Sequence, residues 1–180
     1  AVTVDRYLMD TPDKGDGSLT GYNVWKWIDY DNYNYPYAGA GSPDFSTNWI
    51  ILRYAEIYLN DAEARLETGD VEGARKAVNM IRQRVGLPDL TESDPEKLRE
   101  LIRKERRIEF AFEEQRFYDV RRWKIGPETQ TTLHGVRFVS PTEFKVTKTD
   151  IRTWNDRLYL TPVPHDEIVR SSVLKQNPGY

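Results

Sequence analysis

The sequence predicts a mainly α fold: a helical hairpin and a long central helix, with loops and short β-strands at both ends of the chain. Two observations support this fold class. Three segments, 49–68, 71–85 and 95–123, repeat apolar or small side chains at steps of three and four residues, the period of an α-helix. The flanking parts are rich in Gly, Pro and Asn and hold only short alternating runs. We expect one domain in three parts: an aromatic-rich loop and strand segment over 1–49, a helical core over 50–125, and a short-strand and loop segment over 126–180.

The composition excludes several classes of protein. The chain has 180 residues and a formal net charge of −3, which argues against the dominant basic face of a nucleic-acid-binding protein. The sequence contains no cysteine, which excludes disulfides, thiol catalysis and thiolate metal sites. No apolar run in the sequence approaches the ~18 residues of a membrane-spanning helix. We therefore expect no nucleic-acid partner.

The N-terminal part is unusual for its aromatic residues. Turn-forming residues dominate 1–21, whereas 22–29 (YNVWKWID) has the composition of a strand. Residues 30–48 form a predicted irregular loop with several Gly and Pro. Residues 22–49 hold nine of the chain's 22 Trp, Tyr and Phe residues. This density makes the segment the first place to look for ligand binding.

Residues 49–85 predict a pair of helices joined by a tight turn. The first helix should run over 49–68 and the second over 71–85, with Gly69-Asp70 as the turn between them. Ala62 and Ala74 are small where the two helices would touch, as in a tetratricopeptide-like hairpin. No second copy follows at a 34-residue step, and one such unit does not bury its own face.

The third helical segment carries the most charge. Ser93 or Asp94 is suited to the N-cap, and Pro95 to the first position, of a helix over roughly 95–123. Residues 96–124 hold ten Lys or Arg beside seven acids. Glu105, Glu109 and Glu113 follow at four-residue steps, where like charges repel. We expect arginines from this helix or its neighbours to pair with them, because a buried unpaired charge costs several kcal/mol. A catalytic role is less favoured, because arginines lower the pKa that a general acid needs raised.

The C-terminal part predicts short strands rather than helices. Alternating patterns favour strands at 136–139, 142–148 and 157–161, followed by a short helical turn near 165–170. His134 and His165 have no companions at metal-ligand spacing, so no metal site is assigned.

Five segments resemble the C-terminal part of the SusD/RagB family of outer-membrane nutrient-binding lipoproteins. In order they are RYAEIYLNDAEARLETGD, VNMIRQRVGLP, ERRIEFAFEEQRFYDVRRWK, LYLTPVPHDEI and the terminal QNPGY, within residues 50–180. The resemblance implies a mostly helical fold with tetratricopeptide-like hairpins. It also implies a non-catalytic protein of the outer-membrane surface that captures oligosaccharides or peptides and delivers them to a TonB-dependent transporter.

The resemblance also bears on length. Family members are usually several hundred residues long, so we expect this chain to be a C-terminal fragment or an unusually short member. Membrane association is then expected only through a lipid anchor that this chain lacks. The family's ligand surface draws on both halves of the protein, so the site in this chain is expected to be incomplete.

Sugars are recognised by aromatic faces with amides and carboxylates nearby for the hydroxyl groups. Residues 22–37, in the segment before the RYAEIYLN helix, supply both kinds of group. The candidate ligand-binding residues are Trp25, Trp27, Tyr30, Tyr33, Tyr35, Tyr37, Asp31 and Asn32. The alternative for these aromatics, Trp25 and Trp27 above all, is packing beneath a long loop. No cofactor is expected.

Two further functions remain open. The chain could be a helical-hairpin interaction module that docks on the transporter without touching ligand. A glycoside hydrolase would need two carboxylates about 5–10 Å apart in a cleft, and the sequence nominates no such pair.

Overall fold

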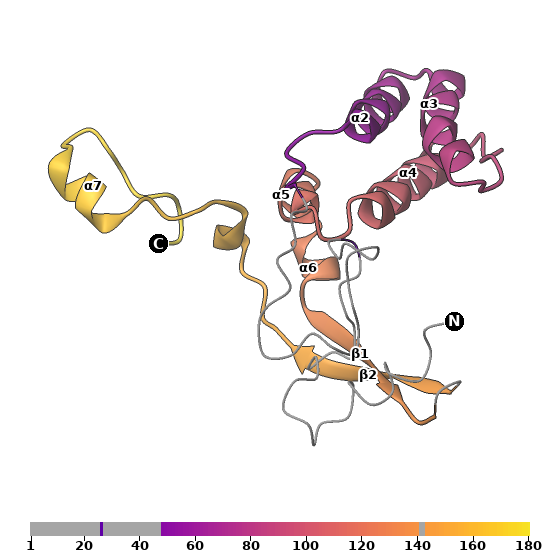
Figure 1. Ribbon diagram of the computed structural model, residues 1–180. Helices are drawn as coiled ribbons and strands as arrows, with labels where there is room; N and C mark the ends of the chain where they lie inside the picture. Colours follow the sequence, from indigo (N-terminus) through magenta and orange to yellow (C-terminus); the bar gives the residue numbers. More distant parts are fainter. Residues whose placement is uncertain (1–25, 27–47, 141–142) are drawn as a thin grey trace. The chain divides into compact units, whose positions relative to one another are not determined.

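The computed structural model describes Lys26 and residues 48–140 and 143–180 (Figure 1). The chain divides into two compact units, one within residues 26–116 and one containing residues 117–180. The predicted mainly α fold is confirmed, while the division of one domain into three parts stays a prediction. The described elements, in chain order, are α2 (Tyr54–Glu67), α3 (Val71–Arg84), α4 (Pro95–Glu109), α5 (Gln115–Arg122), α6 (Gly126–Thr129), β1 (Thr132–Phe138), β2 (Phe144–Ile151), the 3-10 helix η2 (Asp156–Tyr159) and α7 (His165–Arg170).

Helices α2 and α3 form the predicted hairpin. Gly69 makes the turn with a φ of +88°, in the left-handed region that glycine adopts without strain. The Asp70 side chain then caps α3 by accepting a hydrogen bond from the Gly73 amide at 2.8 Å. Ala62 and Ala74 are both fully buried, which confirms that small residues lie where the helices meet. The first helix begins five residues later than predicted, because Arg53 is in an extended conformation (φ −145°, ψ 157°).

Helix α4 packs on this hairpin and completes the core of the first unit (Figure 1). Of the two predicted N-cap residues, Ser93 and Asp94, the structure has Asp94, which accepts from the amides of Glu96 and Lys97 at 2.9 and 3.2 Å. Leu98 and Ile102 of α4 are almost completely buried against the hairpin. Burial of one such side chain stabilises a fold by about 1.5–3 kcal/mol.

The prediction of one helix over 95–123 is wrong. Helix α4 ends at Glu109 and α5 begins at Gln115. Between them Phe112 and Glu114 have φ values of 62° and 64°, which an α-helix does not allow. Phe110, at the end of α4, is 3% exposed and belongs to the core of the first unit. The helical period runs across the break, so the sequence pattern alone gives no sign of it.

The second unit contains a β-hairpin. Strands β1 and β2 pair antiparallel, with a register irregularity between Leu133 and His134. The predicted strands at 136–139 and 142–148 fall within or beside these strands, whereas 157–161 is not a strand. Asn155 caps the 3-10 helix η2 there by accepting from the Arg157 amide at 3.0 Å. The predicted helical turn near 165–170 is confirmed as α7.

The C-terminal motifs bind one another. The side chain of Gln176, in the QNPGY ending, accepts from the amide of Val163 at 2.8 Å and donates to its carbonyl at 2.9 Å. Asn177 donates to the carbonyl of Thr161 at 2.6 Å. The ending therefore closes back on the segment that precedes α7.

No helix within the described part of the chain is long and apolar enough to cross a membrane.

Candidate functional site

The candidate ligand-binding residues lie outside the described residues. These are Trp25, Trp27, Tyr30, Asp31, Asn32, Tyr33, Tyr35 and Tyr37. Their role in binding stays a prediction. Lys26, which lies between Trp25 and Trp27 in the sequence, is described, and its contacts lead to the end of α4.

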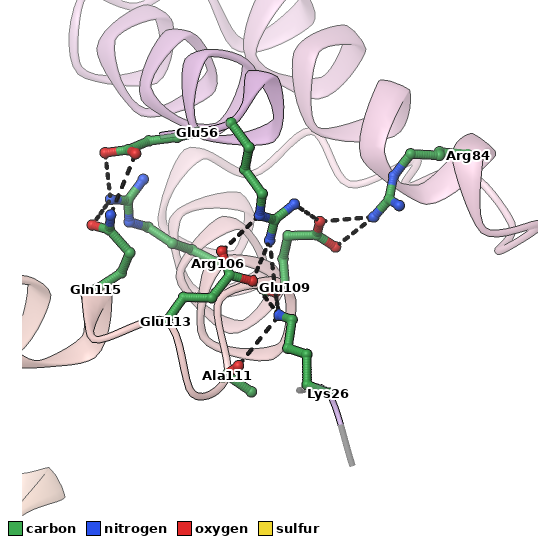
Figure 2. Close-up of polar contacts among 9 residues, drawn as sticks. Lys26, Glu56, Arg84, Arg106, Glu109, Ala111, Glu113 and Gln115 are labelled. Carbon is green, nitrogen blue, oxygen red and sulfur yellow. Dashed lines mark hydrogen bonds and ion pairs between the residues drawn. The ribbon is translucent and has the colours of Figure 1, made fainter. Parts of the chain in front are cut away.

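The described polar contacts concentrate where α4 ends (Figure 2). We call Lys26, Arg53, Arg84, Glu109 and Glu113 the junction cluster. Arg53 is bound by both acids: Nε donates to Glu113 Oε2 at 2.7 Å and Nη2 to Glu113 Oε1 at 3.0 Å. Its Nη1 donates to Glu109 Oε1, and its Nη2 also donates to the Glu109 carbonyl at 2.8 Å. The guanidinium lies 4.5 Å from the ring centre of Phe110, within range of a cation–π interaction.

Two further cations complete the junction cluster. Arg84, at the end of α3, donates through Nη2 to both carboxylate oxygens of Glu109, at 2.7 and 2.9 Å. The ammonium of Lys26 donates to the carbonyls of Glu109 and Ala111 at 2.7 and 3.2 Å and forms an ion pair with Glu113 (Figure 2). Three parts of the chain far apart in sequence thus meet at the α4–α5 junction.

The electrostatics of the junction cluster favour the charged forms. The Glu113 side chain is only 5% exposed, and burial by itself raises the pKa of its carboxyl. Hydrogen bonds from Arg53 and Lys26 more than offset this, so its pKa lies below the usual value. Burial likewise lowers the pKa of Arg53, but the bonds to Glu113 and Glu109 raise it by more. Both groups therefore stay ionised at neutral pH.

A neighbouring group of contacts joins α4 to α2 and to the start of α5. Arg106 is 3% exposed and donates to Asn60 Oδ1 at 2.8 Å and to Gln115 Oε1 at 3.4 Å. Gln115 in turn donates to Glu56 at 3.3 Å, and Arg106 lies 3.9 Å from the same carboxylate (Figure 2). These side chains hold the first residue of α5 against α2.

The predicted neutralisation of Glu105, Glu109 and Glu113, which we call the acidic column, is confirmed. Glu105 pairs with Arg82, Glu109 with Arg84 and Glu113 with Arg53, each at 2.7 Å. All three arginines come from neighbouring elements rather than from α4 itself. A carboxylate whose pKa is held down, as in Glu113, is the opposite of a general acid, which needs a raised pKa. The ion pairs of the junction cluster join the end of α4 to α3 and to the residue before α2.

Sequence reasoning identified the acids but not the partners Arg53 and Lys26. Arg53 opens the RYAEIYLN motif, but the sequence placed it inside the helix predicted over 49–68, so its position gave no signal. Lys26 carried no signal of its own. Among the described residues, no group of three or more His, Asp or Glu side chains is placed to hold a metal ion.

The tetratricopeptide-like hairpin, the helix packed across it and the loop-rich C-terminal part together have the fold of a SusD-like protein. The chain belongs to the SusD family, whose model matches residues 4–180. A SusD-like protein from Bacteroides fragilis, known from a crystal structure, is 98% identical and superposes with a TM-score of 0.88. That comparison covers 100% of this chain and 34% of the other.

Two curated relatives come from Formosa agariphila. SusD-like protein P2 is 38% identical over 155 residues, which cover 79% of this chain and 28% of the relative. SusD-like protein P25 is 32% identical over 172 residues, which cover 83% of this chain and 31% of the relative. The chain thus spans less than a third of the length of these two relatives. Proteins of this family are generally carbohydrate-binding, non-catalytic and associated with the outer membrane.

Proposed function

We propose that this chain binds glycans at the outer-membrane surface and takes part, without catalysis, in delivering them to a TonB-dependent transporter. The observation that carries the proposal is the SusD family match over residues 4–180, because the family is generally carbohydrate-binding. The same family match supports the further proposal that the protein is a lipoprotein at the cell surface. A peptide nutrient is the alternative ligand.

The proposed binding segment is the ring-rich stretch 22–37, which combines flat apolar faces with amide and carboxylate groups. The junction cluster supports this assignment indirectly. Its acids are committed to arginines, so the charged α4–α5 junction contributes structure, and recognition is left to other parts of the chain.

The test is a titration of the chain with a panel of oligosaccharides and peptides, followed by tryptophan fluorescence and calorimetry. The double variant Tyr33→Ala/Tyr35→Ala should weaken binding of a responding glycan about tenfold, because each lost aromatic contact is worth about 0.5–1.5 kcal/mol. Tyr54→Ala is the matched control, since Tyr54 is 70% exposed on α2, outside the segment. Unchanged affinity in the double variant would refute the proposed segment, and no response to any glycan would refute glycan binding by this chain.

A second candidate is an interaction module that docks on the transporter without contacting ligand. The observation in its favour is the exposed apolar stretch before and at the start of α2, where Ile51, Leu52 and Ile57 are 79%, 74% and 56% exposed. Exposed apolar residues in a cluster are typical of protein–protein contact. Binding to the purified transporter, lost in Ile51→Asp/Leu52→Asp and accompanied by no glycan response, would favour this candidate over the first.

A further inference from the structure

Helix α5 carries an exposed group of aromatic and basic side chains. Phe117 and Tyr118 are 49% and 63% exposed, and their ring centres lie 5.3 Å apart in an edge-to-face arrangement. The guanidinium carbon of Arg121 lies 3.4 Å from the centre of the Phe117 ring, a cation–π contact. We call these three residues the α5 platform. All three lie within the second unit of the chain.

The helix brings the three side chains together and fixes them. Phe117 and Arg121 are four residues apart, so they lie one above the other on the helix surface, with Tyr118 beside them. Arg121 Nη1 also donates to the Phe117 carbonyl at 2.9 Å, which holds the guanidinium on the ring. Asp119 and Val120, which face away from the platform on the helix, are each 2% exposed. One side of α5 is therefore buried, while the two rings of the platform stay exposed to solvent.

Arg121 has no acidic partner among the described residues. The one acid of α5, Asp119, pairs with Arg122 at 2.9 Å, and Glu114 directly before the helix is exposed and makes no ion pair with Arg121 in the described part of the chain. The bond to the Phe117 carbonyl uses one of the five N–H groups of the guanidinium. The remaining N–H groups are available to a ligand, and the half-buried charge favours one that is anionic.

The α5 platform thus offers two kinds of contact side by side. An exposed aromatic ring accepts the C–H face of a sugar ring, and a guanidinium binds a carboxylate through two parallel hydrogen bonds. A uronic acid carries both groups, because its carboxylate is attached directly to the sugar ring. A neutral sugar would leave the Arg121 charge without a partner, and an acidic side chain of a peptide has no flat C–H face beside its carboxylate.

We infer that the α5 platform binds uronic acids within an oligosaccharide, with a sugar ring on Tyr118 and its carboxylate on Arg121. The inference rests on the proposed function, because it names a class of glycan that this chain takes. The site lies outside residues 22–37 and outside the junction cluster, so its residues can be tested separately from both.

The probe is a tetramer of galacturonic acid, and its methyl-esterified form is the matched neutral ligand. Calorimetry compares the parent chain with Arg121→Gln, Arg121→Lys and Tyr118→Ala. The controls are Arg170→Gln and Tyr54→Ala, because the Arg170 side chain is 74% exposed and Tyr54 is 70% exposed, both outside the platform. Urea unfolding of each variant verifies that the fold is retained.

The parent chain should bind the acidic tetramer about tenfold more tightly than the methyl ester, since one charge-assisted contact is worth roughly that factor. Arg121→Gln should remove this preference, and Arg121→Lys should keep part of it, because lysine keeps the charge but not the paired donors. Tyr118→Ala should weaken binding of the acidic tetramer about fivefold. Neither control should change the affinity for either ligand.

Equal affinity for the acid and the ester, or an unchanged preference in Arg121→Gln, would overturn the α5 site. Tighter binding of an aspartate tetrapeptide than of the acidic tetramer would overturn the class of ligand. A response to neutral glycans alone would overturn this inference and leave the proposed function standing. No response to any glycan would overturn the proposed function itself.

Discussion

Replacing Arg53 by methionine tests whether the junction cluster stabilises the fold. Methionine keeps an unbranched apolar side chain beside Phe110 but removes every hydrogen bond that Arg53 makes to Glu109 and Glu113. Breaking a buried ion pair costs about 3–5 kcal/mol. The cost should be smaller here, because Lys26 still pairs with Glu113 and Arg84 with Glu109. We expect Arg53→Met to lower the free energy of unfolding by about 2–3 kcal/mol.

The assay is urea unfolding followed by circular dichroism at neutral pH, with Lys76→Met as the control. Lys76 pairs with Glu72 at 3.6 Å, but its side chain is 75% exposed, so its loss should cost less than ~0.5 kcal/mol. A double-mutant cycle with Glu113→Gln isolates the pair. Glu113→Gln removes the negative charge that Arg53→Met leaves only partly compensated. The double variant should therefore lose less free energy of unfolding than the two single variants lose together, by about 1–2 kcal/mol. Equal losses in Arg53→Met and Lys76→Met, or strict additivity in the cycle, would show that the cluster does not hold the fold.

Three further predictions concern single sites. Asn79→Ala should lower the free energy of unfolding by about 2–3 kcal/mol, measured in urea. The Asn79 side chain accepts from the amide of Leu90 at 2.8 Å and donates to its carbonyl at 3.2 Å, and both backbone groups would lose this partner. Gly126→Ala should displace Trp154 and change its fluorescence, because a Cβ at Gly126 would lie 2.1 Å from the indole ring; an unaltered spectrum and urea midpoint would contradict this packing. The pKa of Glu113 is lower in the folded chain than in the unfolded one. Its charge therefore contributes stability that is fully present above the unfolded pKa of ~4.3. That stability is lost as the pH falls from there through the folded-state pKa. The urea midpoint of Glu113→Gln should therefore depend less on pH below about 5 than that of the parent chain, and parallel curves would exclude the linkage.

Local signals in the sequence located most of the helices. Asp94 and Pro95 marked the start of α4, and Gly69 marked the turn of the hairpin, because caps and left-handed turns depend on residues adjacent in the chain. The strand predicted over 157–161 failed for a related reason. Its alternation was short, and the cap that Asn155 provides favours the 3-10 helix there.

The candidate site was less accessible to sequence reasoning. The composition of residues 22–37 nominated aromatic ligand contacts, but composition does not place side chains in space. The partners of the acidic column were equally hidden, since Arg53 lies 56 residues from Glu109 and 60 from Glu113 in the sequence. A pattern with the period of one helix carries no information on contacts at that separation.

The sequence by itself determined the mainly α class, the hairpin, the start of α4, the need for arginines beside the acidic column, and the family resemblance. Only the tertiary structure decided where the long charged segment breaks and which cation binds which acid. Left-handed backbone at Phe112 and Glu114 is unfavourable for these residue types when considered alone. Contacts around the turn hold this backbone in place. Phe110 packs in the core, and Arg53 and Lys26 donate to the carbonyls and carboxylates beside the turn. Those contacts come from chain segments more than fifty residues away, so they exist only once the chain has folded.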